Sequence, residues 1–128
     1  MALIRSFRDL NVYQAARTEA QKIYLRSRNF PVEEKYSLTD QIRRSSRAVK
    51  AMVAEAWGRR RYRAVFINKL DEALGEATET QSWLDDCLDC GYLSPEEYRQ
   101  MDAAWQSIGA MVQNMMVKAD DFCGKPHN

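Results

Sequence analysis

The densest positive charge in this chain lies between residues 43 and 63, where eight basic residues accompany one acidic residue, Glu55. Guanidinium groups bind phosphate oxygens through paired N–H donors, so such a cluster is typical of nucleic-acid binding. Trp57 and Tyr62 lie within the segment and could stack on bases, although Trp57 could instead pack inside the protein. The predicted nucleic-acid-binding residues are Arg43, Arg44, Arg47, Lys50, Arg59, Arg60, Arg61 and Arg63.

A second set of residues has the spacing of a zinc site. Cys87 and Cys90 form a C-x-x-C pair, and Cys123 and His127 form a C-x-x-x-H pair. Cys87 and Cys90 end one predicted helix, and Cys123 ends the next, which runs back the other way. Roughly 28 helical residues then separate the pairs by about 40 Å, so one subunit could not close the site. We therefore expect no metal and interpret the cysteines as buried, small apolar side chains.

Catalytic groups are sparse. The only histidine, His127, would have to serve any Ser-His-Asp, Cys-His or di-iron Glu-x-x-His site. The five glycines are scattered and form no phosphate-binding loop. Glu76 and Glu79 could meet other carboxylates, but acidic residues at a helix edge are usually just solvated. The sequence therefore predicts a protein that is not an enzyme and needs no cofactor.

The composition is typical of a single folded domain spanning residues 1–128. Hydrophobic residues make up 45% of the chain, enough to fill a core, and 29% of the residues are charged. The longest apolar runs are too short for a bilayer crossing, and the first residues lack the apolar region of a signal peptide. We expect a cytoplasmic protein without a membrane partner.

Charge is unevenly distributed along the chain, although the net charge is only +1. Residues 1–63 hold 15 Lys and Arg against 6 Asp and Glu, whereas residues 64–128 hold 4 against 12. The two halves therefore carry +9 and −8. They could simply attract each other within the fold. Alternatively, they could create a polarised surface that attracts phosphate or a neighbouring subunit.

The basic residues and the cysteines are expected to lie on helices, because the apolar residues of the chain have a helical period. Apolar residues recur every three or four positions over about residues 9–28, 38–58, 62–90 and 95–119. Residues 1–8 form an arm and residues 124–128 a frayed tail. Because the connections are short and no stretch alternates with period two, we predict an all-α fold, an up-down-up-down antiparallel four-helix bundle. The predicted buried residues of the first two helices are Leu10, Tyr13, Ala16, Ala20, Ile23, Tyr24, Leu38, Ile42, Ser45, Val49, Met52, Val53 and Ala56.

Helix ends are marked by capping residues. The sequence S-P-E-E at residues 94–97 predicts a capping box with proline at the first helical position. Ser37 and Asp40 form a similar pair before the second helix, with Asp in place of the usual Glu. Gly58 and Gly91 could each end a helix by taking a left-handed conformation.

The third predicted helix has a side made of small residues, opposite its apolar side. These residues are spaced by three and four positions, and a helix side of this kind lets another backbone approach closely. The side could be simply solvated, or it could form a contact between subunits. The predicted oligomer-interface residues are Asn68, Asp71, Gly75, Thr78 and Ser82.

Five ordered motifs resemble a known family. They are F-x-D-L-x-V-Y, Y-x-L-T-x-Q-I-R-R-S, A-E-A-W-G-R, F-x-x-x-L-x-x-A-L-G-E and G-Y-L-S. Together, over residues 7–120, they resemble the bacterial four-helix-bundle proteins named after the intervening-sequence-encoded protein of 23S ribosomal RNA. The matching residues are Phe7, Asp9, Leu10, Val12, Tyr13, Tyr36, Leu38, Thr39, Gln41, Ile42, Arg43, Arg44, Ser45, Ala54, Glu55, Trp57, Gly58, Arg59, Phe66, Leu70, Ala73, Leu74, Gly75, Glu76, Gly91, Tyr92, Leu93 and Ser94.

The resemblance implies a cytosolic bundle that assembles into a ring-like homopentamer. The chain is also similar to the accessory proteins of diversity-generating retroelements, which are pentameric and basic and bind nucleic acid and a reverse transcriptase. Two departures stand out. Lys50 replaces a proline that the family often has inside the second helix, and Ala56 replaces a glycine that usually follows the Ala-Glu pair. We therefore expect a straighter and more basic second helix.

The leading hypothesis is a non-enzymatic, oligomeric nucleic-acid-binding protein directed at RNA, as an accessory to an RNA or reverse-transcription machinery. The basic segment between residues 43 and 63 motivates it. The alternative is a structural scaffold or protein-interaction module, in which the charge asymmetry drives self-assembly or binds a protein partner. A pentamer is preferred on the resemblance alone.

Overall fold

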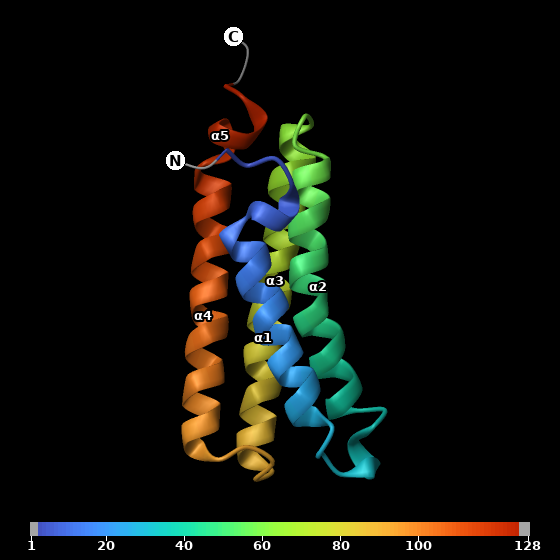
Figure 1. Cartoon of the computed structure of the whole chain (residues 1–128). Helices are drawn as coiled ribbons and strands as arrows, with labels where there is room; N and C mark the ends of the chain where they lie inside the picture. The colour runs from blue at the N-terminus through green and yellow to red at the C-terminus, as the bar shows by residue number, and fades with distance from the viewer. Residues whose placement is uncertain (1–2, 126–128) are drawn as a thin grey trace.

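The computed structural model describes residues 3–125 and is built from helices (Figure 1). No strand occurs within residues 3–125, and four long helices pack against one another, which confirms the predicted all-α class. None of the helices in this range has the length and apolar character needed to cross a membrane. In chain order the elements are η1 (Phe7–Asp9), α1 (Asn11–Ser27), η2 (Val32–Glu34), α2 (Leu38–Gly58), α3 (Arg63–Asp89), α4 (Pro95–Val117) and α5 (Ala119–Cys123).

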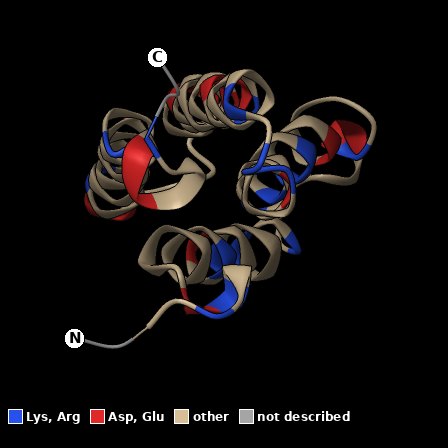
Figure 2. Ribbon diagram, turned by 90° about the horizontal axis from the view of Figure 1, so that it is seen from above, with Lys and Arg blue, Asp and Glu red and all other residues tan. Residues whose placement is uncertain are grey.

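The four long helices surround one core. α2 packs against both α1 and α3, α3 packs against α4, and α1 also contacts α4, so the end-on view shows them around a common centre (Figure 2). Trp105 and Phe66 are the largest side chains that this core buries fully. The predicted apolar side of α2 is confirmed, because Leu38, Ile42, Ser45, Val49, Val53 and Ala56 are buried and Met52 is half-buried.

Ion pairs show the relative direction of α2 and α3. Arg44, in the first third of α2, pairs with Glu76 near the middle of α3. Glu55, near the end of α2, pairs with Lys69 near the start of α3. The two helices therefore run in opposite directions, and Figure 1 shows α1 and α2 doing the same.

Two predicted helix ends are confirmed. The hydroxyl of Ser94 accepts a 3.1 Å hydrogen bond from the backbone N–H of Glu97, and a carboxylate oxygen of Glu97 accepts a 3.0 Å bond from the backbone N–H of Ser94. With Pro95 at the first position, this is the predicted capping box. Just after the end of α3, Gly91 has a φ angle of 76°, a value that glycine adopts without a Cβ clash.

The capping role predicted for Ser37 is wrong. Its side chain makes no capping hydrogen bond at the start of α2, so the box with Asp40 does not form. The hydroxyl instead donates a 2.7 Å hydrogen bond to a carboxylate oxygen of Glu34 in η2. The preceding turn therefore competes successfully for this side chain, a possibility that residue spacing alone cannot exclude.

The left-handed conformation predicted for Gly58 is also wrong. Gly58 is the last residue of α2, and its φ angle is not positive. Arg59, the residue that follows the helix, has φ −112° and ψ 18°, and its N–H donates to the carbonyls of Glu55 and Ala56. Because these bonds already close the helix end, no left-handed residue is needed there.

The last predicted helix is interrupted rather than continuous over residues 95–119. α4 and α5 meet at Lys118, which has φ −93° and ψ 29°. This turn carries Phe122 over the end of the bundle, where its ring stacks on Phe66 with centroids 5.6 Å apart and lies edge-on to Trp57 at 6.3 Å. Burial of aromatic surface accounts for the bend that the periodicity did not predict.

The ends of the chain contain more local structure than an arm and a tail suggest. Within the predicted arm, Ser6 caps η1, its hydroxyl accepting a 3.1 Å hydrogen bond from the N–H of Arg8. At the other end, Gly124 leaves α5 with a φ angle of 77°. Residues 126–128 of the predicted tail lie outside the described part of the chain.

The cysteines differ from one another in exposure. Cys87 is buried, and burial raises the pKa of its thiol to about 12. Cys123 is half-buried, whereas Cys90 is exposed, so its predicted burial is wrong. The reason is that Cys90 follows the last residue of α3, at the rim of the bundle. Within residues 3–125 no three Cys, His, Asp or Glu side chains gather as a metal site would require, and His127 lies outside that range.

Candidate nucleic-acid interface

The eight predicted nucleic-acid-binding residues fall into three groups rather than one patch. Figure 2 shows basic residues along α1 and α2 and acidic residues on α3 and α5. One group lies on the side of α2 that faces α1, one residue faces α3, and the remainder surround the turn between α2 and α3. These groups are Arg43, Arg47 and Lys50; Arg44; and Arg59, Arg60, Arg61 and Arg63.

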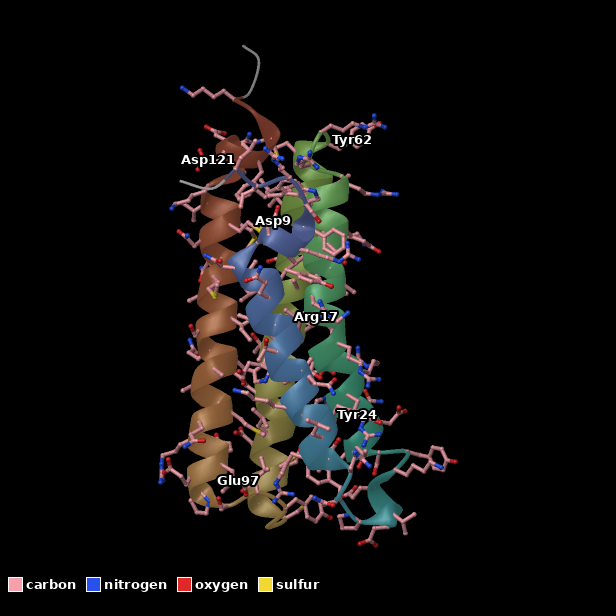
Figure 3. All side chains as sticks on the ribbon, viewed as in Figure 1. Asp9, Arg17, Tyr24, Tyr62, Glu97 and Asp121 are labelled. Carbon is pink, nitrogen blue, oxygen red and sulfur yellow. The ribbon has the colours of Figure 1, made fainter. Side chains whose placement is uncertain are left out.

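Two members of the first group, Arg43 and Arg47, contact α1. The Nε of Arg43 donates a 2.8 Å hydrogen bond to the hydroxyl of Ser27, and the guanidinium carbon lies 4.8 Å from the centre of the Tyr24 ring. The guanidinium carbon of Arg47 lies 5.1 Å from the centre of the same ring. Tyr24, labelled in Figure 3, is half-buried. We call Tyr24, Ser27, Arg43, Arg47 and Lys50 the α1–α2 basic face.

The positive charge of the α1–α2 basic face is not neutralised within the described fold. None of the ion pairs among residues 3–125 involves Arg43, Arg47 or Lys50. Asp40, one turn before Arg43, is exposed and forms none of these pairs either. Arg43 and Lys50 are half-buried and Arg47 is exposed, so all three residues remain at least partly accessible to solvent.

Arg44 behaves differently. Its guanidinium pairs with Glu76 of α3 at 3.1 Å and also with Glu79, one turn further along α3. Glu79 in turn accepts a 3.0 Å hydrogen bond from the indole N–H of Trp83. The two glutamates that the sequence left as solvated acids are therefore the partners of a predicted phosphate-binding arginine.

Two residues of the third group close the end of the bundle. The guanidinium carbon of Arg60 lies 3.9 Å from the centre of the Trp57 ring, and one terminal nitrogen donates a 2.8 Å bond to the Trp57 carbonyl. Arg63 pairs with Asp120 and donates a 3.0 Å bond to the carbonyl of Gly124. The Arg63 contacts tie α3 to α5, the Arg60 contacts stay at the end of α2, and both leave less of the guanidinium for an external ligand.

The two aromatic residues that could stack on bases, Trp57 and Tyr62, differ in how accessible they are. Trp57 is half-buried against Phe122, so it packs in the bundle. Tyr62 is 54% exposed and contacts Arg61, whose guanidinium carbon lies 4.8 Å from the ring centre. Arg61 and Arg59 are themselves exposed. This part of the turn is accessible to a ligand, in contrast to the Trp57 ring.

Tyr24 and Ser27 are members of the site that the sequence did not predict. The 3.6-residue period assigned Tyr24 to the buried side of the first helix, but the ring is only half-buried because it lies at the edge of the contact with α2. The sequence did contain a feature that could have indicated these two residues. Tyr24 and Ser27 are three residues apart on the helix that precedes the arginines, and a short connection makes that helix the neighbour of α2.

The five predicted oligomer-interface residues lie together on an exposed side of α3. A Cβ added at Gly75 would meet nothing within 4 Å. The side is therefore open in the single chain and has room for larger groups. The exposed residues are Asn68, Asp71, Gly75, Thr78 and Ser82.

Part of the charge asymmetry is neutralised between helices. Besides the pairs of Arg44 and Arg63, the Nε of Arg26 in α1 lies 2.7 Å from a carboxylate oxygen of Glu97 in α4. A terminal nitrogen of Arg26 also donates a 2.7 Å hydrogen bond to the carbonyl of Tyr92. The hydrogen bond from Arg26 and the backbone N–H of Ser94 lower the pKa of Glu97 to about 2. Attraction between the halves thus operates inside the fold.

Comparison with known proteins places this chain in a family and finds a similar solved structure. The 23S rRNA-intervening sequence protein family matches residues 8–114. The chain belongs to this family. Its structure is similar to the crystal structure of a protein with unknown function from the S23 ribosomal protein family of Bacteroides thetaiotaomicron, with a TM-score of 0.74 and 28% sequence identity. The similarity covers 83% of this chain and 95% of that one. Among curated proteins, none matches the chain.

The resemblance based on the five motifs is thus confirmed, and most of the matching residues serve the fold. Leu38 and Ile42 are buried in α2, and Phe66 and Leu70 are buried in α3. The G-Y-L-S motif at residues 91–94 contains the positive-φ glycine and the α4 capping serine. Membership of the 23S rRNA-intervening sequence protein family therefore accounts for the four packed helices, while the exposed charged residues must be interpreted from their own surroundings.

Proposed function

We propose that this chain is a non-enzymatic, oligomeric RNA-binding protein that uses the α1–α2 basic face. The proposal takes the bundle as up-down-up-down, so that each long helix runs against the next. RNA is favoured because the family is named for an intervening sequence of 23S rRNA. A reverse transcriptase or another RNA-processing protein is the kind of partner for which it would act as an accessory.

The observation that carries the proposal is the lack of a counter-charge on the α1–α2 basic face. Arg44 has two carboxylate partners, whereas Arg43 and Arg47 have none among residues 3–125. Together with Lys50, they place three positive charges along one side of α2, in steps of four and three residues. Phosphate oxygens would supply the missing negative charge, and each neutralised phosphate would release counterions.

A charge-reversal experiment tests the proposal. One variant replaces Arg43, Arg47 and Lys50 with glutamate. The matched control makes the same change at Lys22, Arg99 and Lys118, which are exposed outside this face. Both variants change the net charge equally, so a difference between them reports the location of the charge. Binding to a labelled single-stranded RNA would be measured between about 50 and 200 mM salt.

We expect the wild-type protein and the control variant to bind, with affinity falling steeply as salt rises. Each phosphate contact contributes about −0.7 to the log–log salt slope on a single strand. The variant of the basic face should lose binding while retaining its helical circular dichroism spectrum. Wild-type protein that binds no RNA at about 50 mM salt would contradict the proposal.

The alternative function is a scaffold in which charge drives self-assembly, and the open side of α3 favours it. In that case the same triple reversal would dissociate the oligomer, because the basic face would contact acidic residues of a neighbouring subunit. Light scattering at micromolar concentration distinguishes the two functions. Loss of RNA binding with an unchanged mass favours RNA recognition, and a fall in mass favours the scaffold.

Self-assembly itself, with a pentamer preferred, has a separate test at Gly75. Because a Cβ there meets nothing within 4 Å, Gly75→Ala should stabilise a single chain by up to about 1 kcal/mol. Gly75→Trp should reduce the oligomer to smaller species without loss of helicity if the side of small residues is buried between subunits. An unchanged mass for Gly75→Trp would place the interface elsewhere.

A further inference from the structure

The arginines of the α1–α2 basic face are held on a neutral ring instead of by acids, and this suggests a more specific role that rests on the proposed function. We propose that Tyr24 is a positioning residue that holds Arg43 and Arg47 as a preformed clamp for the phosphates of single-stranded RNA. Ser27 assists by fixing the orientation of one guanidinium.

The first support is the set of donors that the contacts leave unused. Ser27 occupies only the Nε of Arg43, and the Tyr24 ring occupies only a face of each guanidinium. Among residues 3–125 no acceptor takes the terminal N–H groups of Arg43 or those of Arg47. These are the groups that bind phosphate in a bidentate manner. The arginines are therefore oriented while their phosphate-binding edges stay free.

The second support is electrostatic. The two guanidinium carbons lie 4.8 and 5.1 Å from one ring centre, and hence within about 10 Å of each other, close to the screening length at physiological salt. Two like charges held this closely repel each other unless an anion lies near both. The Tyr24 ring attracts both cations through its π face but supplies no negative charge. A bound phosphate would remove the repulsion that the free protein retains.

The third support concerns the shape of the ligand. Lys50 continues the row one turn beyond Arg47, and exposed Arg17 lies two turns before Tyr24 on the same side of α1 (Figure 3). Tyr24 lies against Arg43 and Arg47, and α1 and α2 run in opposite directions (Figure 1). Arg17, which precedes Tyr24 on α1, is therefore displaced towards the Lys50 end of the row. A row of charges suits a chain of phosphates better than a single ion. The outer faces of the two guanidinium groups offer stacking surfaces to unpaired bases, which favours a single strand.

The test compares substitutions that remove or keep the ring. Tyr24→Leu keeps an apolar side chain but removes the π face, whereas Tyr24→Phe keeps it. The probe is a labelled oligouridylate of about 20 nucleotides, measured across a salt series with the full-length protein. Tyr36→Leu is the matched control, since Tyr36 is an exposed tyrosine whose cation–π partner is Lys35 and not a cation of this face.

We expect Tyr24→Leu to weaken binding by roughly 3- to 10-fold, while Tyr24→Phe and Tyr36→Leu bind as the wild type does. The salt slope should stay unchanged in all three, because every cation is retained. In an Arg43→Gln, Arg47→Gln background, Tyr24→Leu should have no further effect. If Tyr24 instead stacked on a base, the loss would persist in that background, and the clamp would be overturned.

Ser27→Ala gives a second measurement that does not depend on the ring. It removes the hydrogen bond to Arg43 and should weaken binding by roughly 2-fold, but only when Arg43 is present. Melting temperature and light scattering confirm that each variant is folded and assembled. Wild-type protein that fails to bind the oligouridylate overturns both the RNA-binding function and the clamp. Normal wild-type binding with unaltered Tyr24→Leu and Ser27→Ala variants overturns the clamp alone.

Discussion

Arg43 and Arg44 are adjacent in the sequence, yet they have opposite surroundings. Arg43 faces α1, where it contacts a hydroxyl and an aromatic ring. Arg44 faces α3, where it pairs with Glu76 and Glu79. A rotation of about 100° around one helix therefore separates a positive charge that remains available from one that is neutralised. The density of arginine along a sequence is a poor measure of the charge that a ligand meets.

The same contrast extends along both sides of α2. On the α3 side, Glu55 pairs with Lys69, and buried Ser45 and Thr80 share a 2.9 Å hydrogen bond. On the α1 side, none of the ion pairs within the described residues joins the two helices. Ion pairs and a buried hydrogen bond thus join α2 to α3. The contact of α1 with α2 instead combines apolar packing, cation–π contacts and the hydrogen bond from Arg43 to Ser27, none of which neutralises the arginines.

The largest stability difference should come from reversing the charge of each of the two neighbouring arginines. Arg44→Glu places a third carboxylate beside Glu76 and Glu79 and should lower the free energy of unfolding by about 2 kcal/mol. Arg43→Glu should lower it by less than about 1 kcal/mol, because Ser27 keeps its other bond, to the carbonyl of Tyr24. Urea denaturation followed by circular dichroism measures both.

The effect on RNA binding should have the reverse order. Arg43→Glu removes part of the α1–α2 basic face and should weaken binding strongly, whereas Arg44→Glu alters a side already occupied by acids. Equal losses of stability for the two variants would mean that the Arg44 pairs are fully screened by solvent. Equal losses of binding would mean that both sides of α2 contact RNA.

A smaller loss of stability should follow from removing the buried hydroxyl on the α3 side. Thr80→Val preserves shape but breaks the bond to Ser45, which is fully buried. The hydroxyl of Ser45 then keeps only a long 3.4 Å contact to the Ile42 carbonyl. We expect a loss of about 1 kcal/mol in urea denaturation. An unaltered midpoint would show that the remaining contact satisfies Ser45.

Much of the fold was predictable because it depends on local periodicity. The buried side of α2 and the capping box at residues 94–97 follow from residue spacing. The bend at Lys118 was not predictable, since it depends on Phe122 reaching Phe66 from a distant part of the chain. Ser37 was mispredicted for a related reason, because Glu34 was an equally close partner.

For the candidate site, the sequence could identify the basic residues but not which of them lack an acidic partner. Which of them remain unpaired depends on the helix that each side of α2 faces, and therefore on packing. Glu76 and Glu79 could be matched with Arg44 only once α2 and α3 were placed side by side. Tyr24 shows the same limit, since its role depends on lying at the edge of the α1–α2 contact rather than on its place in the helical period.

The smallest effect, and the one that extends the comparison to α1, concerns the pairing of Arg26 with Glu97. α1 also has a neutralised arginine on one side, Arg26, and a ring that supports unpaired arginines on the other. The pKa of Glu97 is lowered from 4.5 to about 2 by the hydrogen bond from Arg26 and by the backbone N–H of Ser94. Because the folded-state pKa lies below the unfolded value, this pair stabilises the fold above about pH 4.5 and ceases to do so as the pH falls towards 2.

Glu97→Gln isolates that contribution, since glutamine can still accept the capping bond from the N–H of Ser94. The melting temperature of the variant should lie slightly below that of the wild type above about pH 4.5, and the gap should close as the pH falls to about 2. The gap should be small because the side chains of Arg26 and Glu97 are 31% and 40% exposed, so solvent screens the pair. A gap that persists at pH 2 would mean that the variant disturbs the cap rather than the charge. Equal melting temperatures at neutral pH would mean that Arg26 is as free of counter-charge as Arg43. The contrast between neutralised and available arginines would then be confined to α2.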